Sequence, residues 1–205
     1  MDLPRVEREL KKRTACPYRW GRKQSNMWDK ETNFIYTTYS CDALLRKTHA
    51  LDPALRDYAL NRWYNFWSAM AVEDIFTAHD NVVAHTNSYD KLVDFSIDGV
   101  AFDHKTTVFP KGFGYDFAYA KAHPRKLIEW LYQNQSQEGR KHLKNRLFIV
   151  LYDNKTAAHW KMKAEIMQFQ KAIDSYVKQF SAQKLQQFSF DGEAVYADIL
   201  WIVNS

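Results

Sequence analysis

Cysteine, glycine and proline are all scarce in this chain of 205 residues. Neither Cys16 nor Cys41 has a Cys-x-x-Cys partner, which argues against a zinc site built on them. Two free thiols are the simpler expectation, with one disulfide as the alternative. The six glycines and five prolines form no long linker, and the sequence contains no internal repeat. These scarcities favour a continuous folded chain.

Long apolar runs are absent as well. No stretch approaches the roughly 18 apolar residues that a membrane span requires. The N-terminal sequence MDLPRVERELKKRT lacks the apolar segment of a signal peptide. We therefore expect a soluble, cytoplasmic protein without a membrane partner.

The composition is that of a globular protein with a real core, since 46% of residues are hydrophobic and 26% are charged. The length fits a single domain over residues 1–205. Within it we predict a basic N-terminal extension (1–50), a core (51–153) and a C-terminal helix and strand (154–205).

Positive charge is concentrated near the N-terminus. Residues 1–23 contain eight Lys or Arg against three acids, a net charge of +5 that equals the formal charge of the whole chain. Such a segment suits a polyanionic partner, although a solvated helix followed by a basic loop has the same composition.

The expected elements alternate between helices and strands. Asp52 and Pro53 form a helix start, and the helix should continue to about Ala78. The continuous apolar run RLFIVLYD is typical of a buried central strand. Further helices are predicted over 4–13, 124–137 and 157–180, and further strands over 33–40, 81–87, 91–97, 100–107 and 194–203.

The segment KLVDFSIDGVAFDHKTT is predicted to be a β-hairpin, because Asp98-Gly99 favours a type I′ turn. Asp94 then faces Asp103 across the two strands. Side chains alternate between the faces of a strand, so one face carries Asp94, Ser96, Ala101, Asp103 and Lys105. His104 lies on the other face with Phe95 and Phe102, and its imidazole is expected to point away from the acids.

Opposed carboxylates repel each other, at about 0.2–1 kcal/mol when exposed and more when buried. A divalent cation between Asp94 and Asp103 would offset this repulsion, with Lys105 beside it. The alternative is an ordinary solvent-facing strand of mixed charge. Glu73 lies near the apolar side of the preceding helix, at helical spacing from Phe66 and Met70, and is a further candidate ligand.

These residues resemble the PD-(D/E)XK nuclease superfamily. The similarity covers about residues 52–153, with Asp94 as the first acid, Asp103 and Lys105 as the acid-x-lysine pair, and Glu73 as the helix acid. Val93 stands where the family usually has proline. The resemblance implies an α/β fold with a restriction-endonuclease-like αβββαβ core, in which a central mixed sheet is flanked by helices.

The resemblance also implies chemistry. Glu73, Asp94, Asp103 and the backbone carbonyl of His104 would bind Mg²⁺ or Mn²⁺, and Lys105 would orient the attacking water. The reaction would be hydrolysis of phosphodiester bonds in nucleic acid, with DNA favoured over RNA as the substrate. Three basic residues near the core would contact phosphates: Lys111, Arg125 and Lys126. A homodimer would suit cleavage of both strands of a duplex.

Two other hypotheses stay open. The chain could be an inactive nuclease-fold protein that binds nucleic acid or a partner protein. It could also be an unrelated α/β domain in which the hairpin is an exposed edge. The last hypothesis predicts no metal affinity, and it predicts that Asp94→Ala leaves stability unchanged or improves it.

Overall fold

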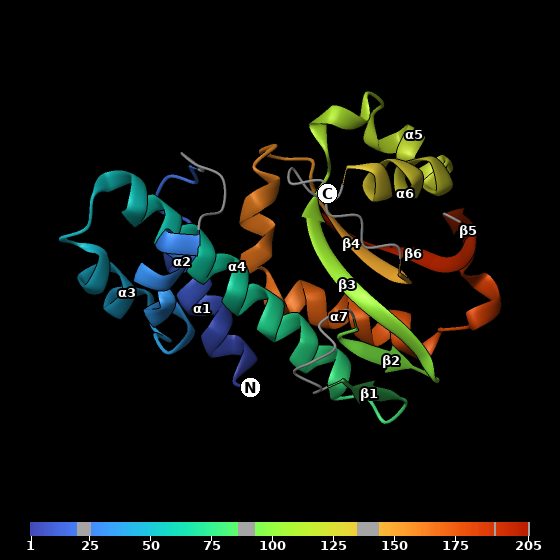
Figure 1. Ribbon diagram of the computed structural model, residues 1–205, viewed down its shortest axis with the longest axis horizontal. Coiled ribbons are helices and arrows are strands. Elements are labelled where there is room, and N and C mark those ends of the chain that lie inside the picture. Colours follow the sequence, from blue (N-terminus) through green and yellow to red (C-terminus); the bar gives the residue numbers. More distant parts are fainter. Residues whose placement is uncertain (20–25, 86–92, 135–143, 191, 205) are drawn as a thin grey trace. The chain divides into compact units, whose positions relative to one another are not determined.

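A computed structural model of the chain describes residues 1–19, 26–85, 93–134, 144–190 and 192–204 (Figure 1). These residues form two compact units. The first consists of Met1–Val72 with Lys163–Met167, and the second of Glu73–Met162 with Gln168–Ser205. The prediction of a single domain stays a prediction. Among the described residues, no helix has the length and apolar character needed to cross a membrane.

The first unit is helical. Its elements are α1 (Leu3–Arg13), α2 (Asn26–Glu31), the 3-10 helix η1 (Asn33–Tyr36), α3 (Cys41–Thr48) and most of α4 (Pro53–Thr77). Asp2 caps α1 by accepting a hydrogen bond from the Arg5 amide at 3.0 Å. Asp52 caps α4 in the same way through the Ala54 amide. The predicted starts of these two helices are confirmed, and both cysteines are free.

The strand predicted over 33–40 is wrong. The backbone carbonyls there bond to side chains instead: the Thr38 hydroxyl donates to the Phe34 carbonyl at 2.6 Å, and the Trp63 indole, from α4, donates to the Thr38 carbonyl at 2.6 Å. Aromatic and β-branched residues gave this segment its strand-like composition. Its polar groups are satisfied by a tight turn and by α4, so no neighbouring strand is required.

The second unit contains a six-stranded mixed sheet of order β1-β2-β3-β4-β6-β5. The first three strands are antiparallel, β3, β4 and β6 are parallel, and β5 is antiparallel to β6. The strands are β1 (Val82–Ala84), β2 (Phe95–Ile97), β3 (Val100–Val108), β4 (Arg146–Asp153), β5 (Gln186–Phe190) and β6 (Glu193–Asn204). The mixed α/β class is therefore confirmed, and β5 is an addition to the predicted elements.

Helices cover both faces of this sheet (Figure 1). On one face, α5 (Phe117–Ala122) and α6 (Pro124–Gln133) lie over a core that includes Leu127, Phe148 and Ile199. On the other face lies α7 (Ile166–Lys178), whose Tyr176 hydroxyl donates to Asp198 in β6. Two short 3-10 helices, η2 (Lys111–Phe113) and η4 (Ala182–Lys184), complete the connections.

The helix predicted over 157–180 divides into a 3-10 helix, η3 (His159–Ala164), and α7. Met162, Ala164 and Ile166 are all buried. A spacing of two residues does not keep side chains on one side of an α-helix, which repeats every 3.6 residues. Ala157 also has a left-handed φ of 54°, so a regular helix does not begin there.

Candidate metal centre

The predicted hairpin turn is confirmed. Asp98 and Gly99 both have positive φ, at 46° and 80°, as a type I′ turn requires. The register pairs Ile97 with Val100, Ser96 with Ala101 and Phe95 with Phe102. Local sequence thus determines the geometry that leads into the candidate site.

Strand β3 separates the predicted site residues between its two faces. Asp103 is paired with Arg146 in β4, and Lys105 is paired with Phe148, which belongs to the core under α6. His104 points to the opposite face, where its ring stacks on Phe95 at 5.8 Å between centroids. Asp103 and Lys105 therefore share a face, as predicted, and His104 lies on the other one.

Asp94 departs from the predicted alternation because it precedes the first residue of β2. Its Oδ2 accepts hydrogen bonds from the His104 amide at 2.8 Å and from His104 Nδ1 at 2.7 Å. The His104 amide thus bonds to the Asp94 carboxylate, where a regular strand pair would offer a backbone carbonyl. The prediction that the His104 imidazole points away from the acids is consequently wrong for Asp94.

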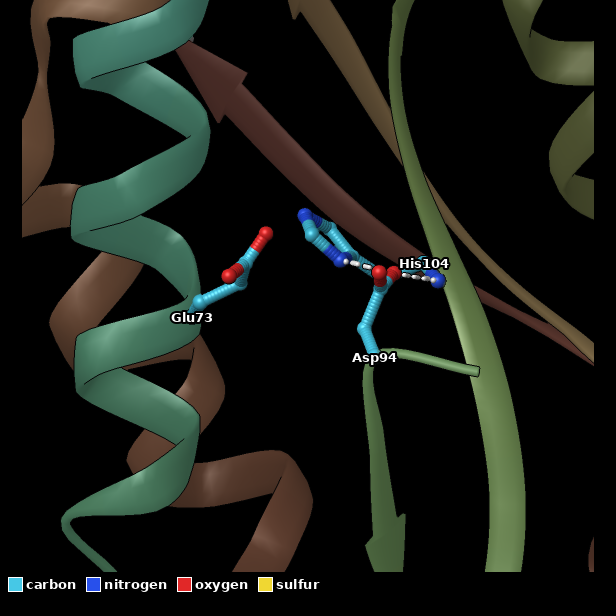
Figure 2. A group of neighbouring side chains, drawn as sticks. All are labelled: Glu73, Asp94 and His104. Atoms are coloured by element: carbon cyan, nitrogen blue, oxygen red, sulfur yellow. Dashed lines mark hydrogen bonds and ion pairs between the residues drawn. The ribbon is translucent and has the colours of Figure 1, made fainter. Parts of the chain in front are cut away.

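Glu73, near the end of α4, points toward the same pair (Figure 2). One potential ligand atom from each of Glu73, Asp94 and His104 lies within 4.8 Å of the others. Phe76, one helical turn beyond Glu73, stacks on Phe95 at 4.4 Å between centroids. This aromatic contact joins the last turns of α4 to the hairpin and so positions Glu73.

The two carboxyl groups have opposite pKa shifts. Burial raises the pKa of Glu73 above its usual value, against the attraction of the imidazole. Burial also acts on Asp94, but the hydrogen bonds from the His104 ring and amide outweigh it and hold the pKa of Asp94 below its usual value. Asp94 is therefore the carboxylate that stays charged, and Glu73 is the one that takes up a proton more readily.

Asp103, the second predicted ligand, forms an ion pair with Arg146 at 3.0 Å, and the Arg146 side chain is only 5% exposed. A guanidinium thus already offsets its charge. Lys105 follows it on the same face of β3. The structure therefore brings Glu73 and Asp94 together with His104, and it does not place Asp103 in that group.

Two of the three residues predicted to contact phosphate interact with other groups of the protein. Arg125 donates to the Gln187 carbonyl at 2.9 Å and lies 3.4 Å from Glu129. Lys126 lies 3.5 Å from the same carboxylate. Lys111 is exposed in η2. Their role in phosphate binding stays a prediction.

The chemistry of the group fits a divalent ion. Bonds of about 2.0–2.3 Å to one ion place its ligand atoms roughly 3–4.5 Å apart, and one potential ligand atom from each of the three residues lies within 4.8 Å of the others. His104 Nδ1 is hydrogen-bonded to Asp94, which leaves Nε2 to face an ion; Asp94 would then orient the imidazole, as is common for metal-binding histidines, and Glu73 would be the carboxylate ligand. A site that includes an imidazole beside a carboxylate suits Mn²⁺ better than Mg²⁺. The sequence analysis did not predict the imidazole as a ligand, although His104 is two residues from Phe102 and therefore lies on the same strand face, the one on the side of α4.

Comparisons with protein-family models, with curated proteins and with solved structures gave no match.

Proposed function

We propose that this protein is a metal-dependent nuclease that hydrolyses phosphodiester bonds of nucleic acid, with DNA as the preferred substrate. The observation that carries the proposal is the convergence of Glu73, Asp94 and His104 from a helix, a pre-strand residue and a strand. Carboxylates brought together around an imidazole are best neutralised by a divalent cation. The motif resemblance supports the same reaction class.

In this proposal the residues divide the work according to their environments. Asp94 stays ionised and holds the imidazole of His104 in one orientation. Glu73, whose pKa is raised, is suited to accept a proton from the attacking water near neutral pH. A bound Mn²⁺ or Mg²⁺ would supply Lewis-acid activation of the water and of the scissile phosphate.

A second candidate is a nuclease-fold protein that binds nucleic acid without cleaving it. It is favoured by the ion pair of Asp103 with Arg146 and by the position of Lys105 on the face opposite to His104. Asp103 is not part of the group around Glu73. The two candidates differ in cleavage and agree in metal binding.

The test is calorimetric titration with Mn²⁺ and with Mg²⁺, followed by cleavage assays on circular single-stranded and double-stranded DNA. We expect Mn²⁺ to bind more tightly, and Asp94→Asn and His104→Gln each to weaken binding at least tenfold. Asp80→Asn, an exposed acid of the same unit, is the matched control and should change nothing.

Each outcome has a distinct meaning. Cleavage that requires metal and disappears in Asp94→Asn would establish the nuclease. Metal binding without cleavage of either DNA circle would favour the second candidate. If wild-type protein binds neither ion, the metal centre is rejected, and with it the catalytic proposal.

A further inference from the structure

A pocket of about 390 Å³ lies in the second unit, on the α7 side of the sheet. This volume is within the range of small-molecule sites. The polar side chains and the aromatic ring that matter for its chemistry are Asp198, Tyr176, Phe180, Ser175, Ser181 and Lys184. None of these residues belongs to the group around Glu73.

Asp198 is the unusual member of this pocket. Its Oδ2 accepts a hydrogen bond from the Tyr176 hydroxyl at 3.1 Å, and its Oδ1 accepts one from the Ile199 amide at 2.8 Å. Both donors are neutral, and no Lys, Arg or His in the described part of the chain forms an ion pair with Asp198. Burial raises the pKa of this carboxyl above its usual value. A ligand that brings N–H donors or positive charge would therefore stabilise the ionised carboxylate.

A carboxylate accepts about four hydrogen bonds, of which two are made here. The remaining capacity suits a ligand with two adjacent N–H donors. Phe180 gives the pocket an aromatic wall, which favours a planar ring. Lys184, exposed and lining the same pocket, favours a ligand whose other end is anionic.

We propose that this pocket binds a guanine nucleotide, with the guanine N1–H and N2–H groups donating to Asp198 and the phosphate facing Lys184. Guanine is the common base that presents two adjacent donors on one edge. Adenine and cytosine present an acceptor beside their donor, and that lone pair would face the carboxylate. A free guanidinium also offers two donors, but Lys184 would repel it.

This inference does not rest on the metal centre, so it is tested in EDTA. Calorimetric titrations with GMP and with AMP should give at least tenfold tighter binding of GMP, since a site built for N–H donors rejects an analogue that lacks them. Asp198→Asn should lower the affinity for GMP at least tenfold. Glu193→Gln, an exposed acid of the same strand, is the matched control.

A second variant guards against a folding defect. Lys184→Gln is at an exposed position and should weaken GMP binding severalfold while leaving guanosine binding unchanged. Equal affinity for GMP and AMP, no binding of GMP at millimolar concentration, or tighter binding of methylguanidine than of guanosine would each overturn the proposal. A failure of this experiment leaves the nuclease proposal untouched, because no metal is present.

Discussion

At the scale of single residues, the two carboxylates near His104 differ in their effect on stability. Asp94 gains stability from its hydrogen bonds to His104, whereas Glu73 is held where its charge is poorly solvated. A residue retained in an unfavourable environment is a sign that function, rather than stability, selects it. Substitution of Glu73 should therefore raise stability while it weakens function.

We predict that Glu73→Gln raises the melting temperature by about 1–3 °C at pH 7 in EDTA. The raised pKa means that the folded state binds a proton more tightly than the unfolded chain, so stability falls as pH rises above about 4.5, the usual value. Glutamine removes that pH dependence. Thermal melts of wild type and variant between pH 4 and 8 measure this difference in pH dependence, with Glu193→Gln as the control.

The same variant should lose stabilisation by Mn²⁺. Wild-type melting temperature should rise with Mn²⁺ concentration, because an ion that binds only the folded state stabilises it. In Glu73→Gln the rise should be much smaller. A variant that melts lower than wild type in EDTA, or that responds fully to Mn²⁺, contradicts the assignment of Glu73.

For Lys163, in the first unit, stability should change with pH in the opposite direction to that for Glu73. Its ammonium donates to the neutral Asn65 Oδ1 at 2.7 Å, and burial lowers its pKa to about 8. The folded state therefore binds fewer protons than the unfolded chain between pH 8 and 10.5, and stability should rise with pH in that window. Part of Lys163 remains exposed, so we expect a smaller effect than complete burial would cause.

We predict that Lys163→Gln is more stable than wild type at pH 7 and that this advantage shrinks by pH 10. Melting curves at intervals of half a pH unit measure the difference. Lys171→Gln, at an exposed position in α7, should show a difference that does not vary with pH. A constant difference for Lys163→Gln would show that its ammonium is well solvated.

At the scale of elements, the β2–β3 hairpin depends on its turn. Gly99 has a φ of 80°, where a side chain is strained even though no atom would contact an added Cβ. Gly99→Ala should therefore lower the free energy of unfolding by about 1–2 kcal/mol, measured by urea denaturation. Asp98→Asn should stay within about 0.5 kcal/mol, since asparagine tolerates this conformation and can accept the Asn81 hydrogen bond. Equal effects would exclude backbone strain as the cause.

The same hairpin shows how far local sequence determines the fold. Asp98-Gly99 and the apolar run of β4 specify their structures locally, and both predictions are confirmed. The course of residues 33–40 depends on Trp63, which is distant in sequence, so composition misled there. The imidazole of His104 joined the candidate site because Asp94 lies one residue before β2, and strand boundaries are the least predictable part of a sequence pattern.

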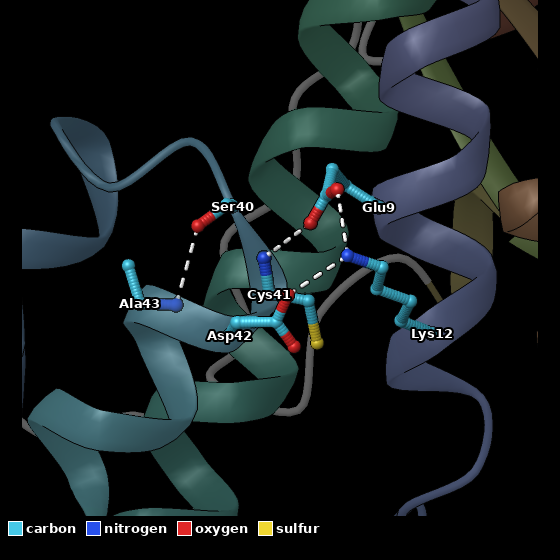
Figure 3. A network of polar contacts seen from close by, with 6 residues as sticks. All are labelled: Glu9, Lys12, Ser40, Cys41, Asp42 and Ala43. Carbon is cyan, nitrogen blue, oxygen red and sulfur yellow. Dashed lines mark hydrogen bonds and ion pairs between the residues drawn. The ribbon is translucent and has the colours of Figure 1, made fainter.

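At the scale of the whole molecule, the concentration of positive charge near the N-terminus is less available than the sequence suggests. Lys11 forms ion pairs with Glu7 and Glu165, and Arg13 is fully buried. Lys12 forms ion pairs with Glu9 and Asp42 in the network that joins α1 to α3 (Figure 3). These three cations help hold the first unit together, so a polyanion would have to compete for them.

The last prediction compares two double variants that each remove two positive charges. Arg8 and Arg19 are exposed, whereas Lys11 and Lys12 are each paired with two carboxylates. If the N-terminal segment binds DNA phosphates, Arg8→Gln/Arg19→Gln should reduce the slope of log affinity against log salt for single-stranded DNA. The reduction should be about 0.7 for each phosphate that the variant no longer neutralises.

Lys11→Gln/Lys12→Gln should leave that slope nearly unchanged, although it alters the net charge by the same amount. Fluorescence anisotropy with a labelled oligonucleotide at low and at physiological salt, in EDTA, measures both slopes. If the two double variants reduce the slope equally, net charge alone governs association and the segment has no specific interaction with DNA. If neither changes it, DNA binds elsewhere on the molecule, because an interaction that releases no counterions from this segment cannot depend on its arginines.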